Sequence, residues 1–302
     1  MEPTQTPVPS LDSAGLREAV DTAAIRTHLQ ELQRIAEAHG GNRAAGTIGF
    51  DASVEYVAAR LEAAGYAVER QPFSFPLNGD EEVSVNLVAE LPGRSASEVV
   101  MLGAHLDSVP GRAGINDNGS GSMMLLTLAE RLPEFEQPDR TVRFAFWGAE
   151  EPGLYGSTAY VEGLDAAERE QLMAYLNFDM IGSPNHVRFI YDDREAAAGS
   201  EAITRLFSDY FDSAGLAWDT FDLSGKTDHA PFSRTGIPTG GLFSGGIELK
   251  TDAQAAAIGG TAGAPADPCN DRICDTTANV NDAALDEMAD AAAHALATLV
   301  GE

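Results

Sequence analysis

The stretch that decides the fold is Val99-Val100-Met101-Leu102-Gly103-Ala104-His105-Leu106-Asp107, in which a short apolar run ends on an imidazole and a carboxylate. Three further acidic sites follow apolar or glycine-rich runs, namely Asp117, the pair Glu150-Glu151, and Asp179. Short apolar runs bounded by glycine and polar turns are typical of buried strands in a mostly parallel sheet. Because such sheets gather ligands at the carboxyl ends of their strands, we expect the four sites to meet in one crevice.

The residue types at these sites suit a pair of divalent metal ions. One imidazole among several carboxylates is a ligand set for ions of the zinc type. Asp107 stands two residues beyond His105, where its carboxylate can hold the other ring nitrogen of the imidazole. Each site also has an ordinary alternative: His105 as a packed core residue, and Asp117 as part of an Asn/Asp/Gly turn.

The adjacent pair Glu150-Glu151 predicts a division of roles. Neighbouring side chains of an extended segment point in different directions, so one carboxylate can bind a metal ion while the other faces the water as a general base. The alternative is a solvated acidic pair, which the apolar flanks at 147–149 and 152–154 disfavour. Asp179 also has apolar residues on both sides, so its ionised carboxylate needs a compensating partner such as a metal ion.

The whole chain predicts a three-layer α/β/α sandwich with a mixed, mostly parallel central sheet and helices on both faces. We expect residues 1–15 to form a flexible tail and 16–302 a single domain, because no linker divides the chain. Strands are expected at 67–75 and 83–90 before the first ligand strand. Apolar periodicity and helix end signals predict helices at 23–39, 50–64, 121–132, 155–163, 166–173, 200–214 and 283–300.

Charge excludes several classes of partner. The 302 residues carry a net charge of −28, with 47 acidic against 19 basic residues, and Lys226 and Lys250 are the only lysines. Binding to nucleic acid or an anionic membrane needs basic patches, so neither is expected. The acidic surface indicates either a halophilic protein or an ordinary acidic one from a genome that favours arginine. We expect no secretory signal peptide and no membrane-spanning stretch in this sequence.

Several motifs together carry a family resemblance. They are the segments at 103–108, 114–121, 147–151, 177–184, 228–232 and 240–243, which read GAHLDS, GINDNGSG, WGAEE, NFDMIGSP, DHAPF and GGLF. In these motifs the chain resembles the zinc aminopeptidases of the co-catalytic di-zinc exopeptidase family, most closely the secreted streptomycete type. The resemblance runs over about residues 23–300 and implies a monomeric hydrolase that acts on peptides.

The resemblance also implies a role for each ligand. His105 and Asp179 would hold one zinc, Glu151 the other, and Asp117 would bridge them. Glu150 would be the general base that takes a proton from the bridging water.

Further features follow from the same resemblance. Met180 and Phe243 match positions that line the pocket for the first side chain of the substrate, although plain core packing would place them equally well. A Cys269–Cys274 disulfide is implied, together with a cis peptide between Asp117 and Asn118. A disulfide favours an oxidising compartment, so the expected location is secreted or periplasmic.

The chain departs from the family between its two cysteines. There the family carries Tyr-His, and the His completes the second zinc site, whereas this chain has Asn270 and Asp271. Asp271 is therefore expected to be the atypical ligand of the second metal, and Asn270 to donate a hydrogen bond to the substrate. Oxygen ligands suit harder ions, so manganese or cobalt is an alternative to zinc at that position. His186, which is outside the family pattern, is the one histidine considered as a replacement ligand.

Two other functions stay open at this stage. The first is a relative that has lost catalysis with the Tyr-His pair and serves as a binding protein with one metal, although retention of Glu150 favours an enzyme. An aminoacyl cyclase on the same scaffold uses one zinc but also needs the missing His.

Overall fold

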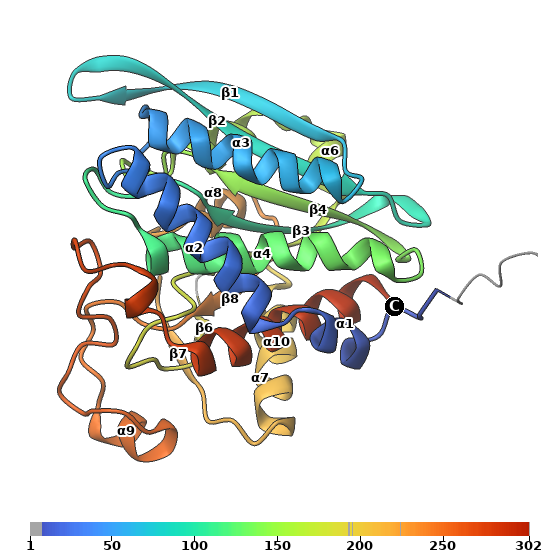
Figure 1. Ribbon diagram of the computed structural model, residues 1–302. Coiled ribbons are helices and arrows are strands. Elements are labelled where there is room, and N and C mark those ends of the chain that lie inside the picture. Colours follow the sequence, from blue (N-terminus) through green and yellow to red (C-terminus); the bar gives the residue numbers. More distant parts are fainter. Residues whose placement is uncertain (1–7, 193, 195, 224, 302) are drawn as a thin grey trace, which may run out of the picture.

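The computed structural model describes residues 8–192, 194, 196–223 and 225–301 (Figure 1). Within these residues the strands form one eight-stranded sheet in the order β1-β2-β4-β3-β5-β8-β6-β7. Their bounds are β1 Val68–Leu77, β2 Asp80–Leu91, β3 Ser95–His105, β4 Arg140–Trp147, β5 Leu172–Asp179, β6 Phe189–Tyr191, β7 Asp219–Phe221 and β8 Thr239–Phe243.

The centre of the sheet is parallel and its outer part is mixed. Strands β4, β3, β5 and β8 run parallel to one another, whereas β1 and β2 pair antiparallel, as do β2 with β4 and β6 with β8. The four central strands therefore end at the same edge, where His105, Trp147, Asp179 and Phe243 are their last residues. This confirms the predicted fold class, and it brings two of the predicted site residues, His105 and Asp179, to one edge of the sheet.

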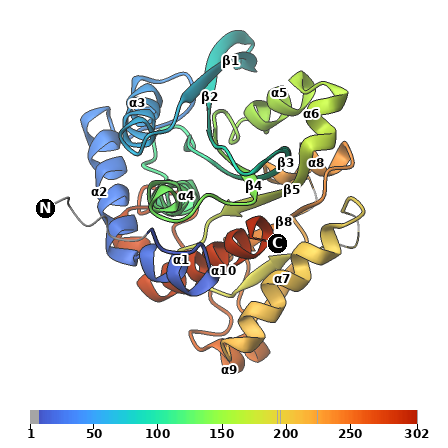
Figure 2. The ribbon, with the colours of Figure 1, turned by 90° about the vertical axis from the view of Figure 1, so that its right-hand side faces the viewer.

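The two faces of the sheet bury different apolar side chains, because successive residues of a strand point to opposite sides. On β3, Leu102 and Ala104 pack into the core cluster that includes helices α2, α3, α4, α7 and α10. Met101 packs instead into the cluster beneath α5 and α8. Helices cover both faces, as Figure 2 shows along the sheet, so the central strands β3, β4, β5 and β8 are mostly buried on both sides.

Most helices lie where the sequence predicts them. The bounds are α1 Ser13–Ala19, α2 Thr22–Ala38, α3 Ile48–Ala63, α4 Gly121–Arg131, α5 Tyr155–Gly163, α6 Ala166–Gln171, α7 Ser200–Ser213, α8 His229–Arg234, α9 Asp252–Ile258 and α10 Asp282–Val300. The predicted helix 166–173 extends too far, because Leu172 and Met173 already belong to β5. Leu172 is buried under the sheet's second apolar cluster, and this packing overrides the helical periodicity.

Residues 13–15 of the expected tail, 1–15, belong to a helix. Helix α1 begins at Ser13, with the side chain of Asp12 capping it by accepting from the backbone of Gly15. Its Leu16 is fully buried, and α1 packs against α10. The sequence hides this helix because it has one turn of apolar signal and a glycine inside it. Residues 1–7 lie outside the described residues, and the extent of the domain stays a prediction.

The net charge of −28 leads to a prediction about salt. Screening weakens repulsion between exposed carboxylates, so sodium chloride should stabilise the folded state. We expect Tm to rise between low and molar salt, by about 3 °C for each kcal/mol of repulsion relieved. Sucrose of matched osmolality is the control for exclusion effects. A steady fall of Tm with salt would contradict the interpretation.

Among the described helices, none is long and apolar enough to cross a membrane.

Candidate metal centre

Two groups of side chains at the carboxyl edge of the sheet have the spacing of metal ligands. His105, Asp117 and Asp179 form one group, and the other contains Asp117, Glu151 and Asp271. Within each group the ligand atoms lie within 4.8 Å of one another. Asp117 belongs to both groups, so the arrangement has two neighbouring positions joined by one carboxylate. All five predicted ligands are thus brought together.

His105 points one ring nitrogen into this cluster. Its Nε2 atom lies 3.3 Å from Asp117 Oδ1, 3.5 Å from Asp179 Oδ1 and 4.0 Å from Glu150 Oε2. The opposite nitrogen, Nδ1, lies 3.2 Å from the backbone oxygen of Asp107. An Nδ1–H that donates to this carbonyl would leave Nε2 unprotonated and free to bind a metal ion.

The carboxylate of Asp107 lies beside the imidazole, with Oδ1 3.7 Å from His105 Nδ1, and it also accepts backbone hydrogen bonds from Glu150 at 3.0 Å and Glu151 at 3.3 Å. Asp107 therefore ties the loop after β4 to the end of β3. This contact sets the positions of both glutamates relative to His105. Its predicted role in orienting the imidazole stays a prediction.

The loop that carries Asp117 is built for a sharp change of direction. Gly114 has φ +61°, and a Cβ there would lie 2.5 Å from the backbone oxygen of Asp117. The peptide between Asp117 and Asn118 is cis, as predicted. Asp275 accepts from the backbone nitrogens of Asn116 at 2.7 Å and Asp117 at 3.1 Å. Asp275 thus holds the backbone on the N-terminal side of the Asp117 side chain.

The disulfide between Cys269 and Cys274 is present, which confirms that prediction. It closes the loop that carries Asn270 and Asp271. Asp271 is exposed, has φ +57°, and its backbone oxygen accepts from Arg112 Nε at 3.3 Å. Asn270 donates through Nδ2 to Asp117 Oδ2 at 2.8 Å, so this side chain contacts the shared carboxylate. Its predicted contact with substrate stays a prediction.

His186 is not a replacement ligand. Its Nε2 lies 3.3 Å from Glu287 Oε2, and it belongs to neither group of metal-ligand spacing found among the described residues. The departure from Tyr-His is therefore not compensated by this histidine.

Electrostatics supports a cationic occupant. Burial is the main cause that raises the pKa of Glu151 to about 10, with Asp117 adding to it. Burial also raises the pKa of Asp117 to about 6, although a hydrogen bond with His105 opposes it. Among the described residues, Glu151 Oε1 and Asp179 Oδ1 are buried with no hydrogen-bond partner. Unpaired buried carboxylate oxygens are costly, so this donor set fits two divalent ions, whose charge would balance its four carboxylates.

Met180 and Phe243 lie beside the ligand set in one apolar cluster. Each is 5% exposed, and Phe243 is the strand partner of Asp179. Phe189 and Phe221 pack against Phe243 with ring centroids at 6.0 Å and 5.3 Å. The apolar side chains of this cluster could contact an apolar side chain of a substrate. They also pack against one another as a small hydrophobic core.

Sequence reasoning missed four buried polar residues around the site. Arg43 is fully buried and donates to the backbone oxygens of Leu106, Ala113 and Gly114. The others are Asp228, Asp275 and Thr227. Asp228 lies in the DHAPF motif, but the contacts of Arg43 and Asp275 join segments far apart in sequence and leave no local signal.

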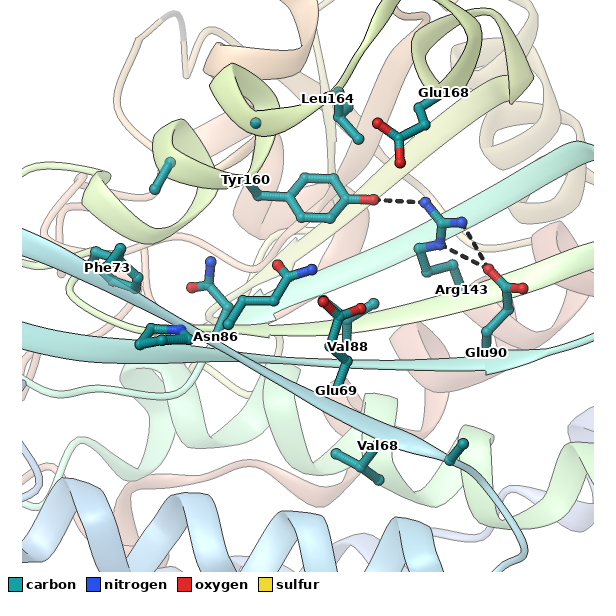
Figure 3. Close-up of a pocket in the computed structure, with 15 residues that line it drawn as sticks. Val68, Glu69, Phe73, Asn86, Val88, Glu90, Arg143, Tyr160, Leu164 and Glu168 are labelled. Atoms are coloured by element: carbon teal, nitrogen blue, oxygen red, sulfur yellow. Dashed lines mark hydrogen bonds and ion pairs between the residues drawn. The ribbon is translucent and has the colours of Figure 1, made fainter.

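A separate cavity of about 790 Å³ lies beside β1, β2 and β4 under α5 and α6. Figure 3 shows Arg143 in it, held by Glu90 and by the hydroxyl of Tyr160 at 2.7 Å. The described residues that line it include none of the predicted ligands, so this cavity is distinct from the metal centre.

Comparisons with known proteins identify related sequences. The sequence model for "Peptidase family M28" matches residues 86–296. Leupeptin-inactivating enzyme 1 of Streptomyces exfoliatus is 45% identical over 93% of this chain and 62% of its own length. An aminopeptidase of Pseudomonas aeruginosa is 48% identical over 69% of this chain and 40% of its own. The chain thus spans less than two thirds of either relative.

A likeness in fold extends to more distant proteins. The solved structure of a zinc aminopeptidase from Bacillus subtilis superposes with a TM-score of 0.77 at 16% identity. It covers 93% of this chain and 95% of that one.

Proposed function

The chain belongs to peptidase family M28, and from this premise we propose that it is a metal-dependent aminopeptidase that releases N-terminal residues from peptides. The observation that carries the proposal is the shared carboxylate of Asp117, which stands in both groups of ligand spacing. A bridging carboxylate between two ions is the arrangement that hydrolases with paired metals use. The aminopeptidase names of similar proteins support the substrate class.

In this proposal His105 and Asp179 hold one ion, Glu151 and Asp271 the other, and Asp117 both. When bound, the ions would polarise the scissile carbonyl and acidify a water molecule. Zinc is the expected metal at the first position. The second has only oxygen ligands from the protein, which suit manganese or cobalt as well.

Glu150 is proposed as the general base. Its side chain is 10% exposed and its Oε2 faces the cluster 4.0 Å from His105 Nε2. Burial raises its pKa above the ordinary value for glutamate, with His105 opposing the shift, so the carboxylate is a stronger proton acceptor. It would take a proton from the attacking water and deliver it to the amine nitrogen that leaves.

The first side chain of the substrate would enter beside Met180 and Phe243, and this cluster favours apolar residues. The surrounding carboxylates would hold the free ammonium group of the peptide. A blocked amino terminus would lose that attraction, which accounts for action at chain ends.

One experiment tests the proposal as a whole. The metal-stripped protein is loaded with zinc, manganese or cobalt, and metal content is measured beside hydrolysis of leucine anilide and of its N-acetyl form. Two ions per chain and cleavage of the free-amine substrate alone are expected. One ion per chain without cleavage would instead favour the alternative function, a catalytically attenuated or silent relative that retains one metal and acts as a binding protein, for which the loss of Tyr-His is the specific observation.

The departure from Tyr-His leads to a separate prediction. Asn270→Tyr with Asp271→His should raise zinc-supported activity, because imidazole binds zinc better than a further carboxylate and leaves more positive charge on the centre. We expect a gain of about 10-fold, the scale of one well-placed ligand or its support. Asp271→His alone separates the metal effect from the tyrosine. No gain, together with two tightly bound zincs in the unaltered protein, would establish Asp271 as a fully competent ligand.

The disulfide also supports a proposed location. Disulfides persist in oxidising compartments, and Cys269–Cys274 is closed here. A secreted or periplasmic protein is therefore proposed.

A further inference from the structure

A row of buried hydrogen bonds leads to the carboxylate of Asp179. Trp147 Nε1 donates to the hydroxyl of Tyr175 at 2.8 Å, and that hydroxyl donates to Asn177 Oδ1 at 2.7 Å. Asn177 Nδ2 then donates to Thr227 Oγ1 at 3.0 Å. Thr227 Oγ1 finally donates to Asp179 Oδ2 at 2.7 Å. We call these four donors, Trp147, Tyr175, Asn177 and Thr227, the hydrogen-bond row.

The row forms because side chains alternate between the two faces of a β-strand. Tyr175, Asn177 and Asp179 are alternate residues of β5 and so face the same side. Trp147 reaches them from β4 across the intervening strand β3. A Cβ on Gly103 of β3 would lie 2.3 Å from the Tyr175 hydroxyl and 2.7 Å from Trp147 Nε1. Glycine at position 103 therefore leaves the path across β3 open.

The donor-to-acceptor direction of the hydrogen bonds in the row is fixed by the residues at its two ends. An indole nitrogen can only donate, and an ionised carboxylate can only accept. Every proton between Trp147 and Asp179 must therefore point toward Asp179. All members are buried, with exposures of 0–1%, where hydrogen bonds are strong and polarise one another. The hydroxyl of Thr227 therefore donates its proton to Asp179 Oδ2.

The two oxygens of Asp179 are consequently unlike. Oδ2 is occupied by Thr227, whereas Oδ1 is buried without a hydrogen-bond partner among the described residues and lies 3.5 Å from His105 Nε2. We propose that Thr227, with the row behind it, is a positioning residue that offers only Oδ1 of Asp179 to the metal ion beside His105. This inference rests on the proposed function, because it assigns a metal to that position.

The test compares two substitutions of Thr227. Thr227→Val keeps the shape and removes the donor, whereas Thr227→Ser keeps the donor. Zinc affinity is measured by competition with a chelator, and the visible spectrum of the cobalt form is recorded. For Thr227→Val we expect zinc to bind about 10–100-fold more weakly at one of the two positions, the usual scale for a lost partner of a ligand. Weaker cobalt absorption should accompany this, as a second carboxylate oxygen raises the coordination number. Thr227→Ser should restore both.

A matched control comes from another buried threonine. Thr127 is fully buried in α4 and donates to the backbone oxygen of Met123 at 2.8 Å. Thr127→Val should leave zinc affinity and the cobalt spectrum unchanged, and metal-free Tm shows that each variant folds. Tyr175→Phe should shift zinc affinity in the same direction as Thr227→Val, but less.

The outcomes separate the two levels of the proposal. Unchanged zinc affinity and cobalt spectrum in Thr227→Val would overturn the role of Thr227 alone. A loss of affinity in Thr227→Ser as large as in Thr227→Val would do the same, because the hydroxyl would not be the cause. If the unaltered protein binds no zinc, the metal centre itself fails and this inference with it.

Discussion

Replacing Glu150 by Ala is expected to lower the rate of peptide hydrolysis by about three orders of magnitude or more, while both metal ions stay bound. The reason is geometric. Glu150 faces the cluster but belongs to neither group of ligand spacing among the described residues, so its removal costs a base and no ligand. The loss should fall on kcat, since substrate contacts are unaffected.

Glu150→Gln is the matched control, because it keeps the volume and removes the proton acceptor. Both variants should be inactive and should retain the zinc content of the unaltered protein. An active Glu150→Gln would show that another group accepts the proton. A metal-free Glu150→Ala would instead make Glu150 a ligand.

Asp117→Asn is expected to have the second large effect, on metal binding itself. Asp117 is the one residue common to both groups, and its amide counterpart carries no charge to bridge two cations. We expect zinc content to fall from two ions per chain to one or none, with activity lowered at least about 100-fold. Atomic absorption on dialysed protein provides the measurement. Asp139→Asn, at an exposed ion pair with Arg94, is the surface control.

Full retention of both ions in Asp117→Asn would contradict the bridging role. Loss of the folded state would be recognised from far-UV circular dichroism. Asp275 holds the backbone of this loop through two N–H groups, and these contacts do not depend on the Asp117 side chain.

The sequence predicts the sheet and the ligands well for a physical reason. Strand β3 has an uninterrupted apolar run that ends at His105, and the position of a ligand at a strand end is fixed by the backbone alone. Contacts between distant segments leave no such signal. Asp107 illustrates this, since its carboxylate accepts from the backbone of Glu150 and Glu151, and nothing in the spacing of these residues predicts the contact.

Short secondary-structure elements are also not predicted from the sequence. The sequence predicts no element at β6, whose three residues are too few to show a period, and it is positioned by pairing with β8. Thr227 lies in a loop, and its hydroxyl has a role only because Asn177 and Asp179 share a face of β5. Such roles depend on register, which local composition does not encode.

The two outer strands of the sheet have a consequence for handling the protein. Strand β1 carries Pro72 and Pro76, which have no N–H to offer an incoming strand, and several of its side chains are exposed. At the other end, β7 is only three residues long and begins with the exposed Asp219. Each margin is therefore a poor template for self-association through backbone pairing. Concentrated solutions should resist the formation of fibrils, and removing both prolines of β1 should weaken that resistance first.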